Sequence, residues 1–377
     1  MRVLHLMSCR GWSSDAYWAA GITAALARNG HRATLVCRRG SDTRVIDRAR
    51  ETGVDRIATL GFRSGVRPAS AAADVRALAG WLADTDVVHV HRGKEHWLAA
   101  AANRIGGTPR PIVRTRHISQ AVRPHALNRW LYGRATSLVV TVTEAIRRQY
   151  LAAGLLPADR VVALPGGVDL ARFHPEVEGS AFRRALGLEA VVPLVGVVSN
   201  LRAMKGHEVV IEATRRLAAT NPGVRIAFIG AGPRDGEIQR AVEAAGQAGR
   251  ITFAGFVSDL PGAIASLDVA VYAPLESEGM SRVIFEYLAM GKAIVASRVG
   301  VVPEVLEDDR TALLVPAGDA SALAAALGRV LDDVALRVRL GCDAARLAAS
   351  TLSSTGVARA LAELYARVTS LEHRPPG

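Results

Sequence analysis

The chain has 377 residues, half of them apolar, and a formal net charge of +12 at neutral pH. This length exceeds what one hydrophobic core usually organises, so we expect two or three domains. The longest apolar runs, such as residues 190–198, are far shorter than the ~20 residues of a membrane helix, and the N-terminus lacks a signal-peptide pattern. Three widely spaced cysteines without a CxxC pair argue against a disulfide framework or zinc knuckle, so we expect a cytoplasmic protein with its cysteines in the core.

The first half of the chain alternates short β-rich runs with helical stretches, which is typical of a parallel sheet buried on both faces. Residues 14–30 are predicted to form a helix with Ser14 or Asp15 as N-cap and Gly30 as its stop. The predicted strands are RVLHLM (2–7), RATLVC (32–37), DVVHVH (86–91), PIVRTRH (111–117), SLVVTVT (137–143) and VVALP (161–165).

A stretch rich in Pro and Gly, PGGVDLARFHPEVEG, is predicted to be an interdomain linker, and the alternating pattern restarts after it. The predicted strands of the second half are LVGVVSN (194–200), VRIAFIGAG (224–232), ITFAGFV (251–257), DVAVYAP (268–274), AIVASRV (293–299) and ALLVP (312–316). We therefore expect an α/β chain of two Rossmann-like doubly wound domains, residues 1–170 and 171–352, with a ligand cleft between them. Residues 353–377 are predicted to add a C-terminal helix that packs back on the first domain.

Charge is unevenly distributed along the chain. Residues 1–170 carry 25 Lys and Arg against 12 Asp and Glu, whereas residues 171–377 carry 22 against 23. An anionic partner of the first half, such as a phosphorylated acceptor or an acidic membrane surface, would explain this excess. A codon bias is the alternative, because 44 of the 47 basic residues are Arg. Nucleic acid is disfavoured as a partner by the low aromatic content and the lack of a stacking motif.

Two glutamates in the segment SEGMSRVIFE, Glu278 and Glu286, are candidates for one binding site. Seven intervening residues would place them about 80° apart on one helix, so we expect them on different elements. With Ser281 as N-cap, Glu286 is predicted on the exposed early turns of a helix and Glu278 in the loop before it. A helix N-terminus preceded by Gly279 suits a diphosphate, and the carboxylates would then accept hydrogen bonds from sugar hydroxyls. Two solvated glutamates are the alternative.

Neighbouring strand ends carry further candidates. Arg202 and Lys205 follow a predicted strand and are placed to neutralise phosphate charge, although basic residues at such positions often lie only at the surface. Gly230 and Gly232 follow the next strand and allow close approach of a ligand to the backbone, which is weak evidence without the other motifs.

Together these motifs resemble those of the retaining GT-B glycosyltransferases of family four, which include lipopolysaccharide-core and phosphoinositol mannosyltransferases. The resemblance covers nearly the whole chain, in matching order and spacing. It rests on RGWSSD near the start, PGGVDLARFHP, SNLRAMKGHE, GAGP, FAGFVSDLP, the glutamate pair in SEGMSRVIFEYLAMGK, and VVPEVLEDD.

The resemblance implies transfer of a sugar from a nucleoside diphosphate sugar, with retention and without a metal or other cofactor. Lys205 would bind the diphosphate, Val257 the base through its backbone, Glu286 the ribose, and Glu278 the donor sugar, where Met280 and Ser281 would supply N–H groups. The implied donor-binding residues are Gly11, Asn200, Arg202, Lys205, Gly230, Val257, Gly279, Met280, Ser281, Val283 and Glu286. His117 and Glu278 are the implied catalytic residues.

The chain departs from the family pattern at three places. Asn200 stands where the family commonly has Arg, which makes Arg202 the candidate replacement. Ser13 and Ser14 stand where a glycine pair is usual, leaving Gly11 as the nearest glycine, and Val301 replaces another frequent glycine. These departures put in question how the N-terminal loop contacts the donor.

Five of the ten histidines fall between His89 and His125. His89 and His91 would share one strand face, but no carboxylate or cysteine completes a metal shell, so we expect no metal. His117 ends a predicted strand where a doubly wound sheet opens to ligands, and the alternative is a strand-end histidine satisfied by a loop. Several cations accompany these histidines, and the predicted acceptor-binding residues are Arg92, Lys94 and Arg123.

We expect an acceptor that is a lipopolysaccharide core or another anionic glycolipid or oligosaccharide, with peripheral contact to the inner face of the cytoplasmic membrane. An inactive nucleotide-sugar-binding protein and a sugar-nucleotide epimerase of the same fold are the alternatives. The sequence leaves open the donor base and sugar, the acceptor linkage and the oligomeric state.

Overall fold

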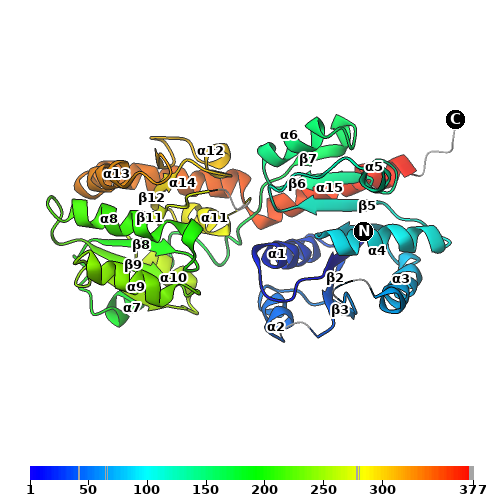
Figure 1. Ribbon diagram of the computed structural model, residues 1–377, viewed down its shortest axis with the longest axis horizontal. Coiled ribbons are helices and arrows are strands. Elements are labelled where there is room, and N and C mark those ends of the chain that lie inside the picture. Colours follow the sequence, from blue (N-terminus) through cyan, green and yellow to red (C-terminus); the bar gives the residue numbers. More distant parts are fainter. Residues whose placement is uncertain (41–42, 64, 66, 277–278, 280, 373–377) are drawn as a thin grey trace. The chain divides into compact units, whose positions relative to one another are not determined.

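The computed structural model describes residues 1–40, 43–63, 65, 67–276, 279 and 281–372. The chain divides into two compact units (Figure 1). Unit 1 comprises Met1–Gly167 and Ser353–Gly377, and unit 2 comprises Val168–Leu352. No helix in the described ranges is long and apolar enough to cross a bilayer.

Unit 1 contains a seven-stranded parallel sheet in the order β3-β2-β1-β4-β5-β6-β7. Its strands are β1 (Arg2–Met7), β2 (Arg32–Arg38), β3 (Ile57–Leu60), β4 (Val87–Val90), β5 (Ile112–Arg116), β6 (Leu138–Thr141) and β7 (Val161–Ala163). Strand order reverses between β1 and β4, and ligands of open α/β sheets bind beyond the carboxyl ends of the strands at such a point.

The helices of unit 1 are α1 (Ser14–Arg28), α2 (Thr43–Glu51), α3 (Pro68–Leu82), α4 (Gly93–Ile105), α5 (Ala126–Gly133), α6 (Glu144–Ala152), the 3-10 turn η1 (Ala158–Arg160) and α15 (Ser354–Glu372). The last of these returns from the end of the chain and packs against α1 (Figure 1, red and dark blue). Val357, Leu361 and Tyr365 form its buried face. These side chains recur at helical spacing, so one side of α15 faces the unit.

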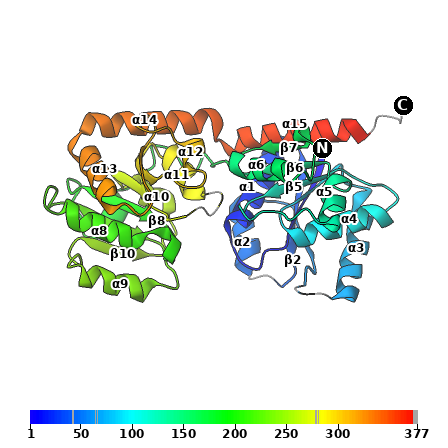
Figure 2. The same cartoon turned by 45° about the horizontal axis from the view of Figure 1, so that its top comes forward.

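Unit 2 contains a six-stranded parallel sheet in the order β10-β9-β8-β11-β12-β13. Its strands are β8 (Leu194–Val198), β9 (Arg225–Ile229), β10 (Ile251–Gly255), β11 (Val269–Tyr272), β12 (Ala293–Ser297) and β13 (Leu313–Val315). Its helices are α7 (Ser180–Ala185), η2 (Ala203–Lys205), α8 (His207–Leu217), α9 (Asp235–Ala244), α10 (Leu260–Ala265), α11 (Arg282–Ala289), α12 (Val302–Val305), α13 (Ala320–Asp332) and α14 (Val334–Thr351). Within this unit α8 packs beside α9 and α13, while α11 packs against α14 (Figure 2).

Every predicted strand is confirmed, but the prediction omitted the short edge strand β3. The predicted N-cap of the first helix is wrong, because α1 begins at Ser14 after the N-cap residue Ser13. The prediction that all cysteines are core residues is also wrong: Cys9 and Cys37 are buried, whereas Cys342 is exposed on α14. A cysteine on the polar side of an amphipathic helix gives no sequence signal that separates it from a core cysteine.

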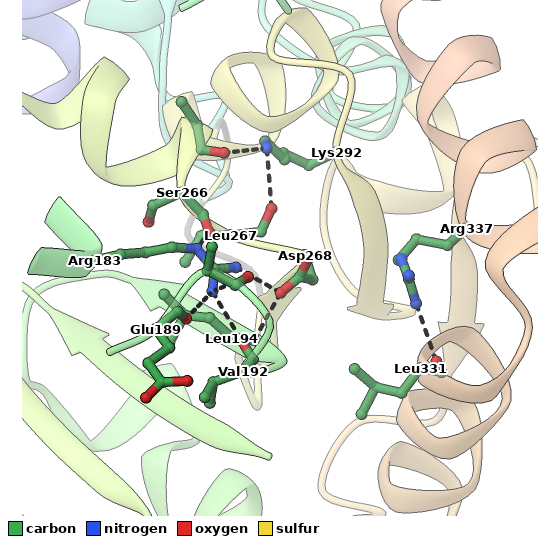
Figure 3. Close-up of polar contacts among 12 residues, drawn as sticks. Arg183, Glu189, Val192, Leu194, Ser266, Leu267, Asp268, Lys292, Leu331 and Arg337 are labelled. Carbon is green, nitrogen blue, oxygen red and sulfur yellow. Dashed lines mark hydrogen bonds and ion pairs between the residues drawn. The ribbon is translucent and has the colours of Figure 1, made fainter. Parts of the chain in front are cut away.

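The amino ends of the unit 2 strands are held by one arginine of α7 (Figure 3). Arg183 Nη2 lies 2.7 Å from Asp268 Oδ2, Arg183 Nη1 lies 2.7 Å from the carbonyl of Val192, and Nε donates to the carbonyl of Ser266 at 2.9 Å. Nearby, Lys292 Nζ donates to the carbonyl of Ala265, the last residue of α10, and to that of Leu267, in the loop before β11. These contacts are structural, because they lie at the edge of the sheet opposite to the carboxyl ends.

Candidate active site

The carboxyl end of β8 leads into the first group of candidate residues in unit 2. Asn200 and Arg202 are exposed and Lys205 is half-buried, close to the start of α8. The first residue of that helix, His207, is buried with its Nε2 3.0 Å from Ser199 Oγ, and burial lowers its pKa to about 4. The imidazole is therefore neutral at physiological pH, and Arg202 and Lys205 supply the positive charge of this loop.

Backbone segments at this edge approach one another closely. Gly206 has a φ of 69°, and a Cβ at this position would lie 2.0 Å from the carbonyl oxygen of Ala273. A Cβ on Gly230, whose φ is 135°, would lie 2.0 Å from the carbonyl oxygen of Ser199. Only glycine is compatible with this packing, so the fold itself requires both residues. Val257, in the loop after β10, is half-buried.

Glu286 lies in the middle of α11 and is only 1% exposed, so the predicted exposed position is wrong. Its Oε1 accepts from Arg282 Nε at 2.9 Å, one helical turn earlier. Its Oε2 is buried and has no hydrogen-bond partner among the described residues. Burial raises the pKa of Glu286, and the charges of Arg282 and Arg172 oppose that rise. A buried carboxylate oxygen without a partner is unfavourable, so a donor from outside the described residues, such as a ligand hydroxyl, would stabilise it.

Helix α11 is held close to β8. The hydroxyl of Tyr287 accepts from the backbone N–H of Val198 at 2.8 Å. Ser281 is the N-cap residue, as predicted, and is buried, but its side chain forms no capping hydrogen bond within the described part of the chain. Val283 is half-buried, and Gly279 is buried with a φ of 90°. The predicted residues Glu278 and Met280 lie outside the described residues.

Unit 1 has a cavity of about 400 Å³ at the carboxyl ends of its strands. The lining residues are Ser8, Arg10, Gly11, Trp12, Ser13, Arg38, Phe62, Arg92 and Lys94. Of the predicted acceptor-binding residues, Arg92 and Lys94 line this cavity, while Arg123 is exposed in the loop before α5 and is not among the lining residues. The cations of the lining favour an anionic ligand.

One cation of the cavity is fixed in place by a carboxylate of α1. Arg92 Nε donates to Asp15 Oδ2 at 2.6 Å, and the hydroxyl of Ser13 donates to the other carboxylate oxygen. Burial raises the pKa of Asp15, but these hydrogen bonds and the charge of Arg92 outweigh it and hold the pKa well below its usual range. Asp15 thus neutralises Arg92, and the other cations of the lining are Arg10, Arg38 and Lys94.

Sequence reasoning missed Arg10 and Arg38. Arg38 is the last residue of β2, and Arg10 follows the end of β1. Their position at the carboxyl ends of strands could have identified both residues from the sequence.

Arg114, on β5, is instead buried, with Nε and Nη1 lacking partners among the described residues. The buried carboxylate of Glu95 accepts at 2.5 Å from the hydroxyl of Ser8, which lines the cavity.

Four buried histidines lie side by side in unit 1. The rings of His5 and His89 stack at a centroid distance of 4.7 Å, those of His89 and His91 at 4.7 Å, and those of His91 and His117 at 5.5 Å. Trp18 packs against the last three of them. Burial lowers the pKa of each imidazole, to about 3 for His117. Within the described ranges no group of three or more His, Cys, Asp or Glu side chains is arranged to hold a metal ion.

Comparisons with known proteins agree with this architecture. The family model described as "Glycosyltransferase Family 4" matches residues 18–172, and the model "Glycosyl transferases group 1" matches residues 192–333. A phosphatidyl-myo-inositol mannosyltransferase of Mycolicibacterium smegmatis is 32% identical over 277 residues, which cover 70% of this chain and 67% of that protein. The chain belongs to the family-four glycosyltransferases.

Two further relatives of this family-four chain match it over a shorter range. The alpha-D-kanosaminyltransferase of Streptomyces kanamyceticus is 30% identical over 62% of this chain and 61% of its own length. The lipopolysaccharide core biosynthesis mannosyltransferase LpsB of Rhizobium meliloti is 31% identical over 53% of this chain and 58% of its own length. The family-four chain thus spans about six tenths of the length of these relatives.

Solved structures show the GT-B fold. A glycosyltransferase from Rickettsia africae has a TM-score of 0.85 with 18% identity, covering 99% of both chains. HepE of Anabaena, in complex with UDP, has a TM-score of 0.82 with 20% identity, covering 97% of this chain and all of that one. The family-four chain therefore has two Rossmann-like domains arranged in sequence as in these proteins.

Unit 1 has a second cavity, of about 1080 Å³, at the amino ends of its strands. Arg2, Asp86 and Pro111, which start or precede strands, contribute to its lining. Open α/β sheets bind their ligands at the opposite edge, so the cavity with the cluster of cations is the better candidate for the active site although it is smaller.

Proposed function

We propose that this chain transfers a sugar from a nucleoside diphosphate sugar to an anionic glycolipid acceptor, with retention and without a metal. The observation that carries the proposal is Glu286, a buried carboxylate whose Oε2 lacks a partner within the described part of the chain. A carboxylate repels phosphate and accepts from hydroxyls, so a ribose fits this position. HepE was solved with UDP, and UDP-sugars are accordingly the first donors to test.

The diphosphate is the leaving group and gains negative charge as the glycosidic bond breaks. In the proposal Lys205 and Arg202, at the loop after β8, and the N–H groups at the start of α11 stabilise this charge. Asn200 and Gly230 complete the proposed donor contacts at the same edge. Cations and helix N–H donors fulfil the role that a metal has in other transferases, so chelation of metals should leave the activity intact.

Retention follows if the acceptor attacks from the face that the diphosphate leaves. The acceptor oxygen forms its bond to the anomeric carbon, the bond to the diphosphate oxygen breaks, and the hydroxyl proton passes to that oxygen. His117 would hydrogen-bond the donor sugar or acceptor, and Glu278 would hold the hydroxyls of the donor sugar. Glu278 is not proposed as a nucleophile, because a carboxylate that holds hydroxyls is poorly placed for attack.

The acceptor is proposed to place a phosphate or carboxylate in the basic cavity of unit 1, near Arg38 and Lys94. Relatives whose names specify phosphatidyl-myo-inositol and lipopolysaccharide core as their substrates or products support an anionic lipid-linked acceptor. A lipid-linked acceptor also requires contact with a membrane surface.

For that contact we propose the exposed surface formed by α4 and α5. Trp97 is 37% exposed and stacks on Trp130 at a centroid distance of 5.9 Å, and Leu127 on α5 is 62% exposed. Arg104 lies over the Trp130 ring, and Arg123 is exposed in the loop before α5. Aromatic and aliphatic side chains next to arginines suit the headgroup region of an anionic bilayer.

The proposal is tested by incubating the protein with a panel of UDP-, GDP- and ADP-sugars and a cell-envelope extract, with and without EDTA. We expect one nucleotide series to give a labelled glycolipid with the anomeric configuration of the donor, and EDTA to have no effect. An inverted product or loss of activity in EDTA would contradict the mechanism. Nucleotide binding without any turnover would favour the inactive binding protein, and a converted free nucleotide sugar would favour the epimerase.

A further inference from the structure

A chain of buried hydrogen bonds runs through the core of unit 1 and leads to His117. It begins at Thr115 Oγ1, which lies 2.6 Å from His89 Nε2. His89 Nδ1 lies 2.5 Å from the hydroxyl of Tyr365, and the same hydroxyl lies 3.3 Å from His5 Nε2. The chain therefore joins β5, β4 and β1 to the C-terminal helix α15.

The second part of the chain consists of three imidazoles. His5 Nδ1 lies 3.1 Å from His91 Nε2, and His91 Nδ1 lies 3.2 Å from His117 Nε2. The remaining nitrogen, His117 Nδ1, is buried and has no partner among the described residues. This nitrogen is the open end of the chain, in the residue that the family resemblance places at the reacting sugar.

The chain has a direction because each neutral imidazole has one donor nitrogen and one acceptor nitrogen. Burial lowers the pKa of all four histidines, so the rings are neutral at physiological pH. A ring that donates through one nitrogen must accept through the other. All the hydrogen bonds therefore run either toward His117 or away from it, and neighbouring bonds polarise one another in the same sense.

Thr115 selects between the two directions. Its side chain is fully buried, and the partner that the described residues give its hydroxyl is His89. If the bonds run toward His117, Thr115 donates to His89 and every donor and acceptor from Thr115 to His117 Nε2 is satisfied, which leaves His117 Nδ1–H to donate to a ligand. In the reverse direction His89 would donate to Thr115, and the buried threonine O–H would lack an acceptor.

We propose that this chain holds His117 as the Nδ1–H tautomer, so that it donates a hydrogen bond to an oxygen atom of the bound ligand. The inference rests on the proposed function only where it names that oxygen as part of the donor sugar or acceptor. The positioning residues are Thr115, His89, Tyr365, His5 and His91. Tyr365 comes from α15, so docking of the C-terminal helix completes the chain that sets the proton of an active-site histidine.

Nitrogen-15 NMR of the intact protein with labelled histidine tests this inference without any substrate. The Nδ1 and Nε2 resonances of His117, assigned by comparison with His117→Gln, report the tautomer directly. We expect a pyrrole-type Nδ1 and a pyridine-type Nε2, with the Nδ1–H form favoured by about tenfold or more, since the other form leaves a buried hydroxyl unpaired. A pyridine-type Nδ1 in the wild-type protein would overturn the proposal.

Three variants distinguish an effect of the hydrogen-bond chain on the His117 tautomer from a general effect on the fold. Thr115→Val removes the terminal donor at nearly constant shape, and Tyr365→Phe divides the chain, so each should give a mixture of His117 tautomers. Thr115→Ser keeps the hydroxyl and should restore the wild-type spectrum. Unchanged tautomers in both disrupting variants would refute the role of the chain. Absence of sugar transfer by the wild-type protein would count against the proposed function and leave the tautomer result standing.

Discussion

Arg282 Nε donates to Oε1 of Glu286 across one turn of α11, at 2.9 Å, and leaves Oε2 of the same buried carboxylate without a partner in the described ranges. The ion pair orients the carboxylate and opposes the rise of its pKa caused by burial, while the second oxygen stays available. A side chain held in this way is prepared to accept a hydrogen bond from a ligand and loses little conformational freedom when it does so.

Glu286→Ala is expected to weaken binding of the bare nucleoside diphosphate, because the ribose contact does not require the sugar. The loss of a charged hydrogen bond corresponds to about 1.5–3 kcal/mol, measured by titration calorimetry. Glu243→Ala, on the exposed side of α9, is the matched control and should bind as the wild type does. Unchanged affinity of Glu286→Ala would contradict the ribose assignment.

The stability of unit 2 should respond to pH through Glu286. Burial raises its pKa, so the folded protein holds the proton more tightly than the unfolded chain, and stability contributed by the protonated form is lost as pH rises through the raised pKa. Glu286→Gln removes this titration. We expect its thermal midpoint to exceed that of the wild type at neutral pH, and the difference to shrink in mild acid. A difference that is independent of pH would show that the carboxylate titrates normally.

Acceptor binding should depend on salt and on the basic cavity of unit 1. Arg38→Gln and Lys94→Gln are each expected to weaken binding of anionic glycolipid, and to reduce its salt dependence, because screening over about 8–10 Å acts mainly on accessible charges. Arg76→Gln, exposed on α3, controls for the loss of charge alone. Arg92 is unsuitable for this test because its removal leaves the half-buried Asp15 without its ion pair. If both cavity variants bind the glycolipid with wild-type affinity and salt dependence, codon bias is favoured as the origin of the positive charge of the first half of the chain.

Membrane contact should depend on the exposed surface of α4 and α5. Leu127→Gln is expected to lower cosedimentation with vesicles of anionic phospholipid several-fold, since it removes apolar area that enters the headgroup region. Val338→Gln, which changes an equally exposed aliphatic residue on α14, should have no effect. An equal loss in both variants, or in neither, would argue against this surface as the site of contact.

Arg183→Lys should destabilise unit 2 by about 1–3 kcal/mol, measured by denaturant unfolding. A lysine cannot reproduce the three directions in which the guanidinium bonds Asp268 and the carbonyls of Val192 and Ser266. Arg184→Lys lies next to it on α7 and is exposed, with a hydrogen bond to Ser180, so it should be nearly neutral. Equal effects of the two substitutions would show that Arg183 does not hold the base of the sheet (Figure 3).

Much of the fold could be predicted from local patterns. Buried parallel strands are continuous apolar runs, and this made every strand except β3 recognisable. β3 has four residues at the edge of its sheet, too few to distinguish a strand from a loop. The loop-then-helix placement around Ser281 also follows from local capping preferences, and the structure begins α11 at the expected residue.

The sequence by itself determined the two α/β units and brought the family motifs to strand ends, because strand and helix periodicities are local properties. Tertiary structure decided which of those residues are buried. Glu286 was expected at the surface, but the packing of α11 encloses it, and no local pattern reports that. The histidine chain depends on His5 and Tyr365, which are 360 residues apart and meet only because α15 returns to the first unit. Such contacts arise from the closure of the fold, so their chemistry becomes visible only in three dimensions.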